Sequence, residues 1–381
     1  MLKNLYGEPR APRTQQELNV ILLAHERYVS FRGGSRAQLA HAELDGLVLA
    51  NRNLAEADFS GASLVGASLY GSNLERASLY CADLRDCNLQ SAMLARADLR
   101  GASFKGAKLS YAVLDNADLR AAMMMYVGPG GVSLVDRERA GGGEGATGVD
   151  FSNCSMKGVS FGNAKLDGAN FTDAILHGAN FKNARLTNVT FRNAVLTGVN
   201  LAELQVPPEA IAGCVGDVTP QAAARFETLK ARLEAHQIWV TSFGAQGAPA
   251  NFEGEDLRPL QGLLVGRSLA GLCARNAVCV GLDFSGSQLQ AAKLDGADLR
   301  DANFSNADLR GVSLRTAKLT HARFGNSNLG RLPLTNGTSL APDLSGADAS
   351  EDQFRGAMFD DKLASLGFVP ARMPGAPPAG P

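Results

Sequence analysis

The chain has 381 residues, 45% of them hydrophobic but only 6% aromatic, and its formal net charge is −1. This near-neutral balance excludes the basic excess of a general nucleic-acid-binding protein. The first ten residues lack the apolar core of a signal peptide, and no apolar run approaches the length of a membrane span. Six cysteines follow no disulfide or metal-ligand spacing, so we expect a cytoplasmic protein with no membrane contact, metal or cofactor.

The chain begins with a predicted helical leader, residues 1–36. Thr14 and Glu17 match a capping box, in which each side chain caps the other residue's backbone amide. Apolar and aromatic residues then recur at helical spacing, namely Leu18, Ile21, Leu22, His25 and Val29. We predict a helix from about Gln15 to Ser30, ended by Gly33 and Gly34, which accept a positive φ.

A strict repeat of five residues follows the leader. From Leu39 to Met124 every fifth residue is large and apolar, as in Phe59, Leu64 and Leu69. Between Ala57 and Leu119 a small residue, usually Ala, stands two positions before each of them. A period of five fits neither a helix, at 3.6, nor a strand, at 2. It requires a backbone that turns a corner every five residues and returns the same two positions to the interior. The repeat therefore predicts a solenoid.

These residues resemble the A-(D/N)-L-x-x consensus of the pentapeptide-repeat family. The resemblance implies an all-β solenoid: a right-handed, four-sided β-helix with four pentapeptides in each coil. Glycines two positions after the large residue, such as Gly61 and Gly101, are expected at the corners, where a positive φ is useful. Asp or Asn just before the large residue is expected to accept hydrogen bonds from nearby backbone, at Asp58, Asn73, Asp83, Asn88, Asp98 and Asp118.

The register breaks once inside this first β-helix, which we assign to residues 37–205. Residues 135–148 are rich in glycine and charge, and we interpret them as a loop insertion from one corner, with the coils stacked continuously beneath it. The repeats resume at Val149 in a new phase. Phe and Leu alternate from Phe161 to Leu196, so opposite walls of a four-sided coil would carry the same residue and form Phe and Leu columns.

A second module follows the prolines at 207 and 208. Residues 206–250 form a linker and a second leader, with one helix expected from about Pro220 to Ser242. His25 and Tyr28 recur there as His236 and Trp239, so we expect both histidines to hydrogen-bond at a leader–solenoid junction and both aromatic rings to be buried there. Residues 251–360 are assigned to a second β-helix, and residues 361–381 to a disordered tail rich in Pro and Gly.

No pattern in the chain predicts catalysis. The histidines have no Ser, Cys or acidic partner at a characteristic spacing, and the glycines at 141–143 lack the Lys-Ser/Thr and the strand–loop–helix context of a phosphate loop. We therefore expect a non-enzymatic protein that binds a protein partner, or acts as a scaffold, through the outer faces of its β-helix. The sequence does not identify the partner. It also leaves the oligomeric state open, and a homodimer is one of the alternatives.

The family resemblance implies a second hypothesis, because some members mimic duplex DNA and protect DNA gyrase from inhibitors. Such mimicry requires a strongly acidic surface in place of phosphates. Acidic and basic residues are nearly balanced along the first repeat run, which disfavours this alternative and any sequence-specific nucleic-acid binding. For the protein-binding hypothesis, the candidate residues are Tyr70 and Tyr111, which the four-sided coil would place on one wall, two coils apart.

Overall fold

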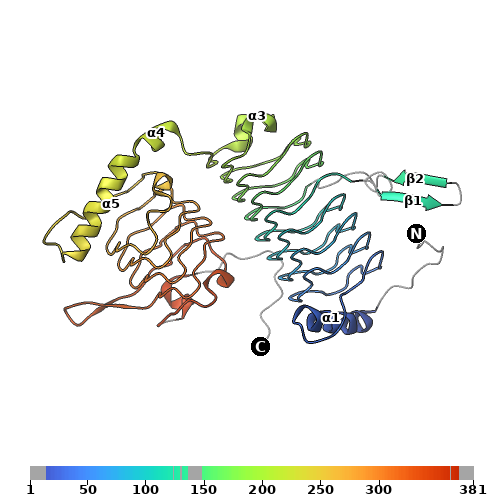
Figure 1. Cartoon of the computed structure of the whole chain (residues 1–381), viewed down its shortest axis with the longest axis horizontal. Helices are drawn as coiled ribbons and strands as arrows, with labels where there is room; N and C mark the ends of the chain where they lie inside the picture. Colours follow the sequence, from blue (N-terminus) through green and yellow to red (C-terminus); the bar gives the residue numbers. More distant parts are fainter. Residues whose placement is uncertain (1–13, 123, 129–130, 136–147, 361, 369–381) are drawn as a thin grey trace. The chain divides into compact units, whose positions relative to one another are not determined.

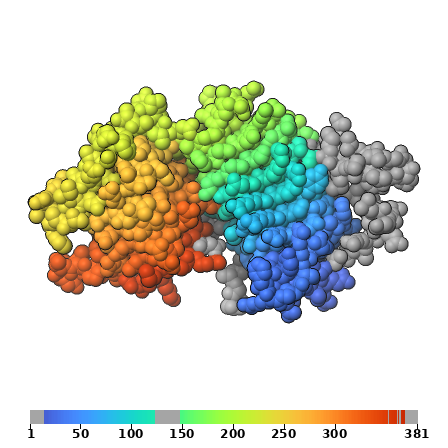
Figure 2. Space-filling model, viewed as in Figure 1, coloured from blue at the N-terminus to red at the C-terminus, as the bar shows by residue number. Residues whose placement is uncertain are grey.

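The computed structural model describes residues 14–122, 124–128, 131–135, 148–360 and 362–368. The chain divides into two compact units, the first ending at Asp217 and the second beginning at Val218 (Figure 1). Each unit has its own apolar core, made of the inward Leu, Phe and Ala residues of its repeats. In Figure 2 the coils of the first unit follow one another from the blue N-terminal end to the green end.

The repeats stack in coils of 20 residues, as the four-sided coil requires. Ser78 pairs with Asp58 in the coil below and with Asp98 in the coil above, both in parallel register. The amide of each large residue donates to a carbonyl one coil on, for example Leu79 to Asp98 at 2.8 Å. The walls consist of these isolated bridges. In the described chain the only regular sheets are two short hairpins. The expected all-β solenoid is therefore correct for the way the coils pair, through parallel β-bridges, but the described chain contains little extended strand.

The corners follow one conformation throughout. The amide of the small residue donates back to the large residue three positions earlier, as Ala82 does to Leu79 at 2.9 Å. The second residue after the large one has a positive φ, which is 64° at Gly61 but also 53° at Cys81. The expected glycine corners are confirmed, and non-glycine residues accept the same strained conformation. All six expected Asp and Asn side chains accept the amide two residues on: Asp58, Asn73, Asp83, Asn88, Asp98 and Asp118.

Phenylalanine columns fill the second half of the first core, as the alternation predicted. Phe171 stacks between Phe151 and Phe191 on one wall, with ring centroids 5.1 and 4.9 Å apart. Phe161 and Phe181 stack at 4.8 Å on the opposite wall, and the two columns meet edge to face. Rings and Leu side chains thereby fill the axis without gaps between coils.

The insertion begins earlier than its predicted start at 135. Strand β1 (Met124–Gly128) pairs antiparallel with β2 (Gly131–Val135), so both leave the coil and form a hairpin. The repeat register was expected to continue to Met124, but the apolar residues of 124–135 pair locally instead of returning to the axis. The coils are continuous beneath the insertion, because Lys108 pairs directly with Asp150. Residues 136–147 of the predicted loop lie outside the described residues.

A helix and short turns close the ends of the first unit. Helix α1 (Gln15–Val29) has the predicted capping box of Thr14 and Glu17 and buries Leu18, Leu22 and His25. At the other end, α3 (Leu201–Leu204) and the 3₁₀ helix η1 (Pro208–Ile211) bury Leu204 and Ala210. Covering the ends removes both the apolar cross-section and the open strand edges from water.

The second leader is two helices and not one. Thr219 caps α4 (Pro220–Ala224), and Arg225 interrupts the helix before α5 (Phe226–Thr241). The 3₁₀ helix η2 (Arg258–Leu260) lies in the irregular first coil of the second unit. A hairpin of β3 (Leu332–Pro333) and β4 (Ser339–Leu340) interrupts a later coil, where prolines disturb the repeat.

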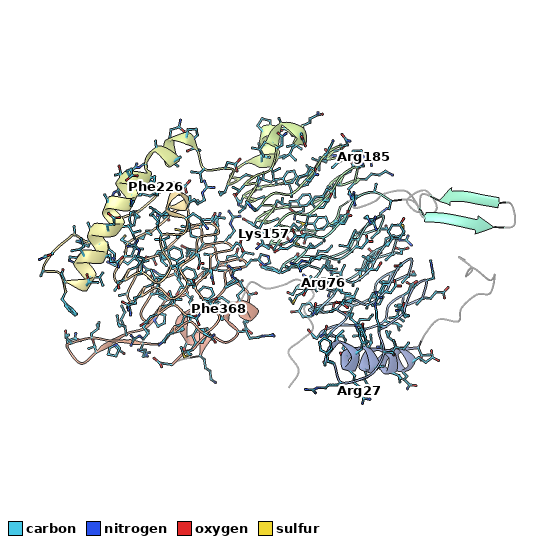
Figure 3. All side chains as sticks on the ribbon, viewed as in Figure 1. Arg27, Arg76, Lys157, Arg185, Phe226 and Phe368 are labelled. Carbon is cyan, nitrogen blue, oxygen red and sulfur yellow. The ribbon has the colours of Figure 1, made fainter. Side chains whose placement is uncertain are left out.

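The last coil extends into the predicted tail. Two 3₁₀ helices, η3 (Glu351–Phe354) and η4 (Leu363–Leu366), lie at this end, and Leu366 and Phe368 are buried. Phe368 contacts Phe354 edge to face at 5.3 Å, and Figure 3 labels Phe368 at this end. The tail therefore does not begin at residue 361, because these apolar residues cover the end of the solenoid. Residues 369–381 lie outside the described residues.

Candidate protein-interaction surfaces

Tyr70 and Tyr111, the predicted candidate residues, stand in adjacent columns along one edge of the first solenoid. The amide of Gly71 donates to Gln90 at 2.9 Å, and the amide of Ser91 donates to Ser110 at 3.1 Å. Tyr70 therefore stands in one column with Gln90 and Ser110, and Tyr111 in the adjacent column two coils further on. The two tyrosines are separated by two coil spacings of about 4.8 Å each. Both are half-buried, and Gln90 between them is buried.

The repeat positions next to the two tyrosines hold few charged residues, and the nearest carboxylate in the following coil is that of Asp150, which accepts the Ser110 hydroxyl at 2.7 Å. We call this region the tyrosine edge and define it by three repeat positions in four successive coils, at which Gln90 and Ser110 are buried: Val48, Ala50, Asn51, Ser68, Tyr70, Gly71, Asn88, Gln90, Ser91, Lys108, Ser110 and Tyr111. Lys108 is the one charged residue among them. Depletion of charge together with tyrosine is typical of the centre of a protein–protein interface.

The opposite wall carries ion pairs built into the repeat. Arg100 donates to Asp98 through Nε at 2.8 Å and through Nη2 at 2.7 Å, and Arg120 repeats the arrangement with Asp118. The guanidinium of Arg100 also lies over the ring of Tyr80, 5.3 Å from its centroid. The hydrogen bonds that Arg100 donates to Asp98 hold the pKa of Arg100 above its usual value. This wall is mixed in charge, as expected, and its carboxylates are neutralised locally.

The two histidines of the leaders occupy matching junctions. Nδ1 of His25 accepts the amide of Ala37 at 3.1 Å, and Nδ1 of His236 accepts the amide of Ala250 at 3.1 Å. Both imidazoles are buried, and burial lowers the pKa of each below its ordinary value. These hydrogen bonds confirm the predicted structural role at both junctions.

The aromatic partners of these histidines are less buried than expected. Tyr28 stacks on His25 at 6.1 Å and Trp239 stacks on His236 at 5.7 Å. Tyr28 is nevertheless 40% exposed, and Trp239 is half-buried. The expectation of burial is wrong for Tyr28, because each histidine and not its stacked ring fills the space between helix and first coil.

Two exposed phenylalanines were missed by the sequence reasoning. Phe31 is 97% exposed and Phe243 is 99% exposed, and each follows the last residues of a leader helix. The left-handed residue that ends α1 is Phe31, with φ of 55°, ahead of the expected Gly33. Aligning the two leaders by their helix ends, and not by their histidines, would have placed these residues together.

Possible metal ligands are dispersed over the described residues. No group of three His, Cys, Asp or Glu in that part of the chain lies close enough to hold a metal ion. One surface hollow has a volume of about 200 Å³, is lined by residues including Gly178, Phe181 and Glu203, and is smaller than ordinary ligand sites. Among the described helices, none combines the length and apolarity needed to cross a bilayer.

The stacked 20-residue coils define a repeat solenoid, and comparison with family models identifies which one. Two models described as pentapeptide repeats match more than half of the chain, at residues 35–69, 53–90, 82–120, 147–185, 161–204, 268–301, 283–321 and 297–331. The chain belongs to the pentapeptide repeat family. A comparison with curated protein sequences gave no match.

Several solved structures match this chain at low sequence identity. A pentapeptide repeat protein from the thylakoid lumen of Arabidopsis thaliana is 17% identical over 52% of this chain and 85% of its own, with a TM-score of 0.22. QnrB1, a plasmid-mediated fluoroquinolone resistance protein, is 15% identical over 86% of this chain and 97% of its own, with a TM-score of 0.23. HetL, involved in heterocyst differentiation regulation in Nostoc, is 20% identical over 92% and 93%, with a TM-score of 0.15.

Proposed function

We propose that this protein is a non-enzymatic binding module of the cytoplasm whose tyrosine edge docks a protein partner. The observation that carries the proposal is the composition of that edge, where Tyr70 and Tyr111 stand among uncharged residues with Lys108 as the one charge. The cytoplasmic setting is supported by the cysteines, all six of which are free thiols.

The right-handed β-helix implied by the family makes such an edge suitable for docking. Backbone hydrogen bonds join each coil to the next, as between Gly71 and Gln90, so the edge is held before a partner arrives. A surface that is already ordered loses little conformational entropy on binding. Tyrosine adds a large contact area with few rotatable bonds and a hydroxyl that finds polar partners.

The paired charges of the opposite wall favour protein binding over DNA mimicry. On this wall Asp98 and Asp118 each accept a bidentate contact from an arginine two residues on. A substitute for a phosphate backbone needs unpaired negative charge to attract basic residues of its target. Here the carboxylates are already neutralised within the same wall.

The test is a double variant, Tyr70→Ala with Tyr111→Ala, compared with Tyr80→Ala from the opposite wall as the matched control. Partners captured by the wild-type protein are identified by mass spectrometry, and one that binds directly is purified for affinity measurements. The proposal expects the double variant to keep its melting temperature within a few degrees and to lose binding by at least about 30-fold. Equal binding by the double variant, or a loss caused by Tyr80→Ala alone, would remove the tyrosine edge from consideration.

A further inference from the structure

Each leader helix ends in the same backbone motif with a phenylalanine at its left-handed position. After α1, the amide of Arg32 donates to Arg27 at 2.8 Å and the amide of Phe31 donates to Tyr28 at 3.0 Å. After α5, the amide of Gly244 donates to Trp239 at 2.8 Å and the amide of Phe243 donates to Val240 at 3.2 Å. Both pairs of hydrogen bonds form a Schellman motif, in which the left-handed residue is usually glycine.

Phenylalanine is an unfavourable choice at this position. The φ angles of Phe31 and Phe243 are 55° and 54°, in a region where the Cβ atom of an L-residue clashes with its own backbone. A side chain that is 97% or 99% exposed offsets none of this strain by packing. Both residues therefore lower the stability of the fold, and both stand at the same place in a duplicated module. Strain that persists without a structural benefit points to a functional requirement.

Two exposed arginines flank Phe31. Arg27 and Arg32 are exposed, and neither forms an ion pair with a carboxylate of the described chain. This differs from the wall arginines such as Arg100, whose guanidinium is held by Asp98. The same side of α1 exposes Val20 and Leu23, by 68% and 54%. Figure 3 labels Arg27 on α1, whose residues form one end of the first unit in Figure 2.

We propose that Phe31 is a docking anchor whose ring enters an apolar pocket bordered by carboxylates on a partner protein. The apolar pocket follows from the exposed ring. The acidic border follows from the exposed guanidinium groups of Arg27 and Arg32, which no carboxylate among the described residues neutralises. A membrane surface fits less well, because one ring and two arginines are too small a set for lasting attachment to lipid. Phe243 repeats the ring between the uncharged residues Ser242 and Gly244, so it lacks the preference for an acidic border.

This docking surface is separate from the tyrosine edge, and its test does not depend on the proposed function. A photoreactive phenylalanine analogue is incorporated at position 31 of the full chain in cells, and the cross-linked segment is identified by mass spectrometry. The proposal expects a protein segment that contains both apolar and acidic residues. Failure to cross-link any protein at this position would overturn it.

Affinity and stability are then measured on purified variants with that partner. Phe31→Gly should weaken binding by at least about 30-fold and raise the melting temperature by about 2–4 °C, because glycine relieves the strain. Arg27→Gln with Arg32→Gln should weaken binding and reduce its dependence on salt. Phe243→Gly is the matched control, expected to raise the melting temperature and leave this affinity unchanged.

A gain in stability together with a loss of affinity in Phe31→Gly would identify Phe31 as a docking anchor. If Phe31 were instead a structural residue, its substitution would lower both stability and affinity. Wild-type affinity in Phe31→Gly would overturn the proposal. So would vesicles of phosphatidylglycerol that bind the wild-type chain but not Phe31→Gly, since the anchor would then belong to a lipid surface. The Tyr70→Ala, Tyr111→Ala variant in the same assay shows which surface holds the partner, so either proposal can fail alone.

Discussion

Single polar residues at inward positions are satisfied by the backbone of the coils. The hydroxyl of Ser72 donates to the Leu69 carbonyl at 2.7 Å, and the thiol of Cys87 donates to the Ala67 carbonyl in the coil below at 3.1 Å. Burial raises the pKa of the Cys87 thiol to about 12, so it stays protonated and unreactive at neutral pH. These residues substitute for alanine in the column without leaving a buried polar group unpaired.

Protonation of the two leader histidines should destabilise the protein. Nδ1 of His25 and of His236 must be unprotonated to accept a backbone amide, and burial lowers the pKa of both below 6.5 in the folded state. The unfolded chain therefore binds more protons below about pH 6.5, and stability falls as the pH falls through that value. We expect the free energy of unfolding in urea to decrease from pH 7 to pH 5.

The histidine variants isolate this effect from the titration of other groups. His25→Gln with His236→Gln should be less stable than the wild type at pH 7 but should vary less between pH 7 and pH 5. His41→Gln, at an exposed corner, is the control and should keep the wild-type dependence. An unchanged slope in the double variant would show that other residues dominate the response to pH.

The pentapeptide places neighbouring residues in opposite environments, so adjacent substitutions should differ widely in cost. Leu99 is 1% exposed in the apolar column, and Leu99→Ala should destabilise the first unit by about 2–5 kcal/mol. Arg100 points outward and is 41% exposed, so losing its ion pair with Asp98 should cost less than about 1 kcal/mol. Urea unfolding of the two variants measures both values. Equal costs would contradict the register of the repeat.

The five-residue repeat predicted some of the larger structural elements but not others. It predicted the corners, the Asp and Asn caps and the Phe columns, because each depends on residues within one coil or stacked on identical neighbours. It did not predict that 124–135 would form a hairpin or that Arg225 would divide the second leader. In both places a segment can either form local hydrogen bonds or continue the regular structure around it. A repeat pattern does not show which of the two is more stable.

Two separate apolar cores should make the whole molecule unfold in two steps. The buried residues form one cluster that ends at Leu204 and another that begins at Leu229. We therefore expect two transitions in scanning calorimetry. Leu99→Ala should lower one of them and Leu299→Ala the other, since each side chain is buried in a different core. A single transition that both variants lower equally would show that the two units unfold together.

The sequence by itself determined the solenoid and the duplicated leaders. It could do so because a strict period of five dictates the direction of every residue from its position in the repeat. Only the tertiary structure decided the true start of the insertion, the bidentate pairing of Asp98 with Arg100, and the burial of Leu366 and Phe368. It also revealed the left-handed, exposed Phe31 and Phe243. These features arise from backbone geometry and contacts at helix ends and corners, where residue type alone does not fix φ or the partner of a side chain.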